Sequence, residues 1–281
     1  MILQSHITSF FGIKWNPFAN DTPSAALLTS VRTDAFCWRI EKLVYEGGFA
    51  LLSGDPGTGK SVTLRLIHSK LEKIPDVCVA ALSRPQSSMA DFYRELGTLF
   101  QIETRSNNRW GSFKAFRERW LSHCNTTRQR PVLIIDEAQE LSVAVANELR
   151  LLASFEFDSR AILTVIIAGD GRLVEKLRSP ELLPLDSRIR TRLKLEAMAK
   201  DELESLLRHS LDEVGQPKLM TDDLIHTVVD HAQGNPRALM ILANELLIAG
   251  LKKQVPKLDT DLFFDFTNIE KNPNKKIKRN T

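Results

Sequence analysis

One glycine-rich stretch has the residue types and the spacing of a phosphate-binding loop: Gly54-Asp55-Pro56-Gly57-Thr58-Gly59-Lys60-Ser61. It follows an apolar run at 49–52, and a predicted helix begins at Val62. The glycines let backbone N–H groups point at an anion, and the amino end of the helix adds partial positive charge. We expect the loop and Val62 to hold the nucleotide, Lys60 to reach its β- and γ-phosphates, and Ser61 to bind Mg²⁺. The flanking strand and helix favour this ATP site over a chance glycine-rich turn.

Two acids, Asp136 and Glu137, directly follow the aliphatic run 132–135. A buried strand delivers such residues at its carboxyl end, where ligands bind in open α/β sheets. Asp136 is expected to hold Mg²⁺ beside Ser61, and Glu137 to polarise the attacking water. A surface turn after a strand is the alternative, and the phosphate loop earlier in the chain weighs against it.

Alternating strands and helices position these residues. The apolar runs that predict strands are 49–52, 77–82, 131–136, 161–169 and 193–195. Because these runs are nearly continuous and alternate with helical patterns, they indicate an α/β fold with a five-stranded parallel sheet covered on both faces. After about residue 198 the strands stop, and four predicted helices form a small all-helical lid: 200–214, 222–233, 236–253 and 259–269.

The predicted boundaries are 1–31 for an aromatic segment, 32–197 for the α/β core, 198–269 for the lid and 270–281 for a basic, disordered tail. We expect the aromatic segment, with Phe10, Phe11, Trp15 and Phe18, to pack on the core because it carries much apolar area.

Composition excludes several classes of protein. The chain has 281 residues, 43% of them hydrophobic and 26% charged, as in ordinary globular proteins. Three widely separated cysteines argue against zinc and disulfides and suit a reducing cytosol, and no apolar run approaches the roughly 18 residues that span a bilayer. The net charge of +3 comes from the tail, whose five basic residues leave the rest close to neutral. That tail is either a solvated end or an arm for nucleic acid.

The two motifs together resemble those of AAA+ P-loop ATPases. The resemblance implies a polar residue at the end of the next strand, where this chain has Asp170 although many relatives have Asn, Gln or Thr. It also implies an arginine finger that serves the neighbouring subunit, for which Arg188 is the first choice, Arg192 the second and Arg190 a third candidate. A basic loop end is the alternative for this segment. The lid arginine of the family matches Arg237, in Gly234-Asn235-Pro236-Arg237.

More narrowly, Phe10–Phe18 and Asp136-Glu137-Ala138-Gln139 look like the corresponding segments of ExeA/GspA-type ATPases, a module that also occurs in the transposition regulators MuB, TniB and TnsC. Secretion-type relatives add a membrane span and a cell-wall-binding region. Because the sequence shows neither, we expect the transposition branch. That resemblance implies a bacterial, cytoplasmic ATPase that forms rings or filaments on double-stranded DNA, marks a target and recruits a transposase, with a target-selection protein as a further partner.

By position in such assemblies, the DNA-facing loops are 83–88 and 101–110, with Arg84, Arg105 and Arg109 as sequence-independent phosphate contacts. Plain solvated arginines are the alternative for each. Rival functions are a secretion-accessory ATPase without DNA affinity, a nucleotide-dependent scaffold without turnover, and a helicase, clamp loader or replication initiator. The acid Glu137 weighs against the scaffold, and the length of the chain weighs against the last group.

Overall fold

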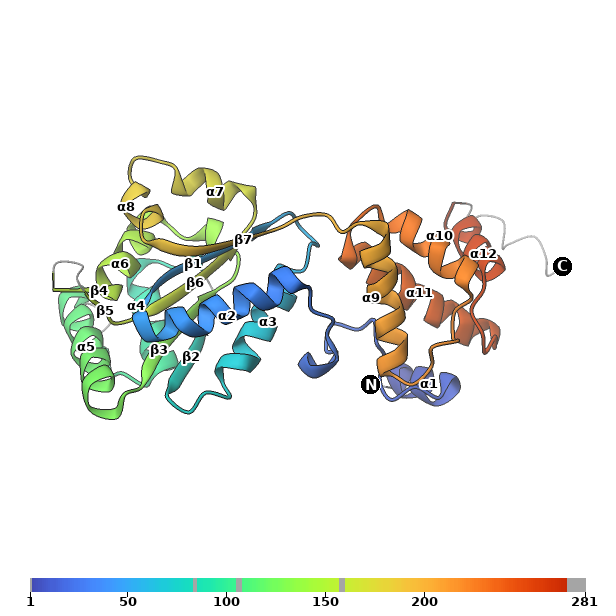
Figure 1. The fold of residues 1–281 in the computed structure, drawn as a ribbon, viewed down its shortest axis with the longest axis horizontal. Coiled ribbons are helices and arrows are strands. Elements are labelled where there is room, and N and C mark those ends of the chain that lie inside the picture. Colours follow the sequence, from blue (N-terminus) through green and yellow to red (C-terminus); the bar gives the residue numbers. More distant parts are fainter. Residues whose placement is uncertain (1, 83–84, 105–107, 157–159, 272–281) are drawn as a thin grey trace. The chain divides into compact units, whose positions relative to one another are not determined.

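The computed structural model describes residues 2–82, 85–104, 108–156 and 160–271 (Figure 1). It forms two compact units. One is the α/β unit, Thr29–Glu196, and the other is the helical unit, in which the residues up to Leu28 join those from Ala197 onward. The expected tail, 270–281, is largely outside the described residues, since α12 runs to Lys271.

A five-stranded parallel sheet forms the centre of the α/β unit, in the order β2-β3-β6-β1-β7, as the sequence predicts. Its strands are β1 (Gly48–Gly54), β2 (Val77–Leu82), β3 (Arg130–Ile135), β6 (Thr164–Gly169) and β7 (Ile189–Leu195). The central strands β1 and β6 are buried along their whole length, because helices cover both faces of the sheet.

Alternate strand residues pack against two sets of helices. Ala50, Leu52 and Ile134 face a core formed with α2 and α3, whereas Leu51 and Leu133 face a core formed with α4 to α8. The helices are α2 (Val31–Glu46), α3 (Lys60–Leu71), α4 (Met89–Phe100), α5 (Arg109–Ser122), α6 (Val143–Ala153), α7 (Gly171–Leu177) and α8 (Leu183–Asp186). Ser30, Ser88 and Ser142 cap three of them through their side chains.

Two strand boundaries differ from the prediction. The predicted strand 161–169 begins only at Thr164, because β5 (Arg160–Ala161) pairs instead with β4 (Ser154–Phe155) in a short antiparallel sheet. The last strand begins at Ile189 rather than at residue 193. β7 is an edge strand, and Arg190, Arg192 and Lys194 on one of its faces are exposed. Only every second residue is therefore apolar or buried, and the continuous apolar run expected of a buried strand is missing.

The helical unit contains α9 (Lys200–Glu213), α10 (Asp222–Ala232), α11 (Pro236–Lys253) and α12 (Thr260–Lys271), close to the predicted ranges. Thr221 caps α10, because its hydroxyl accepts a hydrogen bond from the Leu224 N–H. Within the described residues, no helix is both long enough and apolar enough to cross a membrane.

The N-terminal segment packs on the helical unit, not on the α/β core where we expected it. Phe11 of α1 (Ile2–Phe11) and Phe18 are buried in the same cluster as the inner faces of α9, α10 and α11. Asn16 donates to the Asn244 side chain at 2.7 Å, which anchors the segment to α11. Gly250 of α11 permits the close approach, since a Cβ there would lie 3.2 Å from the Phe11 ring. The apolar side chains of the segment predict that it packs against another surface, but they do not indicate which unit provides that surface.

Candidate nucleotide-binding site

The phosphate loop connects β1 to α3 and is held by its own contacts. Gly54 cannot be replaced without displacing its neighbours, because a Cβ would lie 2.8 Å from the carbonyl oxygen of Leu195. Gly57 and Gly59 have φ values of 87° and 102°, in the region that glycine adopts at little cost. The Thr58 hydroxyl donates to the Asp55 carbonyl at 2.8 Å. These contacts curl the chain into an anion-binding concavity at the start of a helix.

Lys60 lies across this loop. Its ammonium donates to the carbonyl oxygens of Gly54 at 2.8 Å and Asp55 at 3.1 Å, and the residue is only 7% exposed. Val62 follows in the first turn of α3. The loop carbonyls therefore hold the Lys60 ammonium at the place where the phosphates of a nucleotide would bind.

The fold brings Asp136 to Ser61, as the sequence predicts. The Ser61 hydroxyl donates to Asp136 Oδ2 at 2.8 Å, although β6 lies between β1 and β3 in the sheet. The Glu137 backbone N–H donates to the other carboxylate oxygen at 2.9 Å. A hydroxyl and a carboxylate are oxygen ligands of the kind that Mg²⁺ prefers beside phosphates, so this pair fits that ion.

Glu137 follows Asp136 in a left-handed backbone conformation, with φ of 51°. Its carboxylate accepts a short hydrogen bond from the Gln139 side-chain amide. Gln139 is 6% exposed and packs so closely on Gly169 that a Cβ there would lie 2.5 Å from its Oε1. Sequence reasoning gave Gln139 no role of its own, because an amide two residues after an acid carries no distinctive signal.

Asp170 lies at the carboxyl end of β6, next to the phosphate loop, and caps α7 through the Arg172 N–H. The Arg172 guanidinium beside it holds the pKa of Asp170 below its ordinary value, so this carboxylate is ionised at neutral pH. Arg172 is the second residue of this region that sequence reasoning missed.

Arg188 lies far from the phosphate loop of its own chain, whereas Arg192 pairs with Leu51 in the middle of β1. Arg188 precedes Ile189, which pairs with Phe49 at the start of β1, whereas Gly54 at its end pairs with Leu195. At ~3.3 Å per residue, this places Arg188 about 20 Å from that loop. Arg188 donates to the Pro184 carbonyl.

The other two candidates are ion-paired within their own chain. Arg192 binds Asp186 at 2.9 Å, and Arg190 binds Glu46 at 2.9 Å. Arg237 is at the start of α11, where Asn235 caps the helix, and it belongs to the helical unit.

The predicted DNA contacts divide into two groups. Arg84 and Arg105 lie outside the described residues. Arg109 binds both carboxylate oxygens of Glu148, which is 1% exposed and also accepts from the Tyr93 hydroxyl at 2.5 Å. The Arg109 side chain is itself 63% exposed, but it compensates a buried carboxylate, which favours a structural role over the expected DNA contact.

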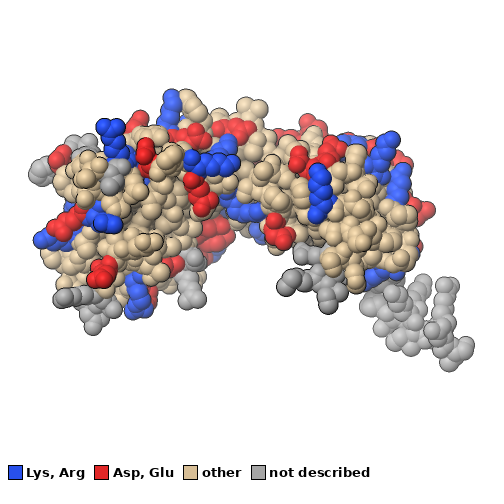
Figure 2. Space-filling model, turned by 90° about the horizontal axis from the view of Figure 1, so that it is seen from below, with Lys and Arg blue, Asp and Glu red and all other residues tan. Residues whose placement is uncertain are grey.

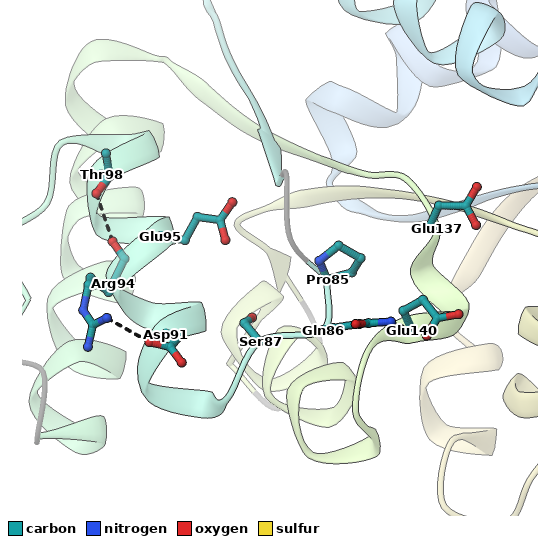
Figure 3. Close-up of a pocket in the computed structure, with 9 residues that line it drawn as sticks. All are labelled: Pro85, Gln86, Ser87, Asp91, Arg94, Glu95, Thr98, Glu137 and Glu140. Carbon is teal, nitrogen blue, oxygen red and sulfur yellow. Dashed lines mark hydrogen bonds and ion pairs between the residues drawn. The ribbon is translucent and has the colours of Figure 1, made fainter.

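A cavity of about 930 Å³ opens beside Glu137 (Figure 3). Glu137 and Glu140, on the loop after β3, lie on one side, and Asp91, Arg94 and Glu95 of α4 on the other. Four of the five charged residues that line this cavity are acidic, and we call it the acidic cavity. Its lining consists of Pro85, Gln86, Ser87, Asp91, Arg94, Glu95, Thr98, Glu137 and Glu140.

Comparison with known proteins agrees with this arrangement. Residues 43–177 match the family model described as an AAA domain. Two solved structures superpose over most of the chain. Cdc6p from Pyrobaculum aerophilum superposes with a TM-score of 0.66, over 89% of this chain and 68% of that one. Drosophila ORC bound to DNA superposes with a TM-score of 0.67, over 95% of this chain and 65% of that one.

The chain has the AAA+ fold. Because the sequence identities to these two structures are 16% and 15%, the superpositions show a shared fold and not a shared function. The chain is also similar to general secretion pathway protein A of Aeromonas hydrophila, at 28% identity over 256 residues. That match covers 89% of this chain but 46% of the relative, so the chain spans about half the length of that protein.

Proposed function

We propose that this AAA+ chain binds ATP with Mg²⁺, assembles on double-stranded DNA, hydrolyses ATP and regulates transposition by marking a target and recruiting a transposase. The observation that carries the nucleotide chemistry is the contact of Ser61 with Asp136 beside the curled phosphate loop. Lys60 binds the β- and γ-phosphates, Ser61 and Asp136 hold Mg²⁺, and Glu137 orients the attacking water. The ion supplies charge neutralisation at the phosphates when it is bound.

Assembly is part of the proposal because one chain holds its phosphate loop and Arg188, the first-choice finger, at opposite ends of β1. Arg188 would serve the nucleotide of a second copy, and the acidic cavity beside Glu137 complements the basic segment 188–192 of that copy. Two different surfaces would then meet, which is a head-to-tail contact that builds a ring or a helical filament. Arg237, which matches the lid arginine of the family, is a further proposed nucleotide-binding residue.

Support for DNA as the partner comes from the resemblance to MuB, TniB and TnsC and from the likeness in fold to an ORC solved bound to DNA. Among the described residues on the face drawn in Figure 2, basic and acidic side chains are interspersed. DNA contacts would therefore come from local loops, such as 83–88, and from the tail, rather than from a broad basic surface on that face.

Binding of labelled duplex DNA, with and without a non-hydrolysable ATP analogue at low salt, tests this proposal. We expect a complex with the analogue and not with ADP, and long particles or rings in electron micrographs. No analogue-dependent complex at low salt would contradict the DNA function.

A secretion-accessory ATPase is the second candidate, because the match to general secretion pathway protein A extends over 89% of this chain. The same measurement separates the two functions. A secretion-type ATPase would bind and hydrolyse ATP without any affinity for duplex DNA.

A further inference from the structure

Arg172, the second residue of α7, is a charged side chain at the carboxyl end of the sheet to which the proposed function gives no role. Its guanidinium binds Asp170, with Nε and Nη2 each 2.9 Å from Oδ2. Its Nη1 lies 3.3 Å from Oε1 of Glu140. Arg172 thus joins the acid that follows β6 to an acid on the loop that follows β3.

The pairing of Arg172 with Asp170 matters for nucleotide binding because Asp170 lies next to the phosphate loop. Gly169 pairs with Ser53 in the parallel ladder, so Asp170 leaves the sheet beside Gly54, where the phosphate loop begins. The charge of Lys60 also acts on Asp170. An uncompensated carboxylate at this place would repel the negative charge of a triphosphate.

We propose that Arg172 is a positioning residue of the nucleotide site, which neutralises Asp170 and holds its carboxylate away from the γ-phosphate. The proposal rests on ATP being the ligand of the phosphate loop and does not depend on DNA or transposition. It explains how an acid can occupy the position at which, by the family resemblance, many ATPases have Asn, Gln or Thr.

The same arginine links the site to the segment after β2. Glu140 accepts a hydrogen bond from the Gln86 side chain at 2.7 Å, and both residues border the acidic cavity (Figure 3). Because Glu140 lies three residues after Glu137, its contact with Arg172 also fixes the loop that carries the proposed catalytic acid.

Equilibrium binding of a fluorescent non-hydrolysable ATP analogue and of ADP to the full chain, without DNA, tests the proposal. We expect R172A to weaken binding of the ATP analogue about tenfold more than binding of ADP, because only the analogue brings a γ-phosphate toward Asp170. Replacing Asp170 as well, in the D170N/R172A variant, removes the repelling charge. Affinity for the analogue should then return to within about threefold of the original.

K114A is the matched control, since Lys114 is equally exposed, at 65%, and pairs with Glu118 on α5. It should leave both affinities unchanged, and thermal melts verify that every variant is folded. Equal losses for the ATP analogue and ADP in R172A would overturn the proposal. So would a D170N/R172A variant that binds the analogue no better than R172A. A wild-type chain that binds neither nucleotide would refute the proposed ATPase itself, and this inference with it.

Discussion

Three carboxylates, those of Asp136, Glu137 and Asp170, gather at the carboxyl end of the sheet, where the negative charge of a triphosphate would be placed. Arg172 binds Asp170, and the charge of Lys60 also acts on that carboxylate. A triphosphate adds further negative charge, so the site suits additional cations from outside the chain. The oxygen pair of Ser61 and Asp136 fits Mg²⁺, and an arginine of a second copy fits the remaining charge.

At this scale, E137Q is expected to retain ATP binding and to lose turnover by about 100-fold or more, because the amide cannot accept a proton from the attacking water. Phosphate release and nucleotide affinity measure the two effects separately. The exposed Glu175 of α7 supplies the control, since E175Q should change neither. Undiminished phosphate release by E137Q would remove Glu137 from the catalytic role.

A second residue prediction concerns the finger. R188A and K60A should each lack turnover, the first because its neighbour's phosphates lose a stabilising cation and the second because it binds ATP poorly. Mixing the two variants should restore part of the activity, since R188A subunits can bind ATP beside K60A subunits that keep Arg188. Phosphate release against mixing ratio measures this. Mixtures that stay inactive, or R188A that turns over normally, would show that Arg188 is not a finger acting between subunits.

At the scale of elements, the N-terminal segment stabilises the helical unit. Phe11 is 4% exposed within the cluster of α9, α10 and α11. F11A should therefore lower the free energy of unfolding of that unit by about 3 kcal/mol, through lost burial and a residual cavity. Hydrogen exchange resolves the effect by element: protection should fall in α9 and α11, but not in α3 or α6.

Phe264 provides the comparison for this experiment, because it is 53% exposed. F264A should change stability by less than about 0.5 kcal/mol. Loss of protection in the α/β unit instead, after F11A, would place the aromatic segment on the core as the sequence suggested.

The contact between α5 and α6 gives a second element prediction. Removing the Arg109 side chain leaves the buried Glu148 carboxylate with the Tyr93 hydroxyl as its side-chain partner among the described residues, so R109A should destabilise the α/β unit by about 2 kcal/mol. Denaturant unfolding measures this, with R94A, which breaks only an exposed pair with Asp91, as a control of small effect. A stable R109A with weakened DNA binding would return Arg109 to the role of a phosphate contact.

At the scale of the whole molecule, DNA binding by the assembled protein should depend strongly on salt and weakly on sequence. Raising salt from 50 to 200 mM should lower DNA affinity by at least about tenfold, because binding through phosphates releases counterions. Fluorescence anisotropy with two unrelated duplexes measures both dependences. A strong preference for one duplex, or an affinity that does not change with salt, would contradict a phosphate-based contact.

The chemistry-bearing motifs were predictable from the sequence because their spacing is local. A glycine-rich loop between a strand and a helix, together with two acids after an aliphatic run, predicts a nucleotide site from short segments of sequence. Four of the five parallel strands followed from nearly continuous apolar runs, and the lid helices followed from helical periodicity. The predicted length of β7 was too short, because exposed charged residues alternate with apolar or buried ones along this edge strand.

By itself, the sequence determined which residues can bind phosphate and metal, and which segments must bury apolar area. The meeting of Asp136 with Ser61 could be predicted from the two motifs, and the structure contains it. Only the tertiary structure decided where the other residues lie. The register of β7 on β1 places Arg188 at the end of β1 that is far from the phosphate loop. Packing assigned the aromatic segment to the helical unit, Arg109 to Glu148, and Arg172 to Asp170. These pairings depend on long-range packing and charge compensation, which local patterns in a chain do not encode.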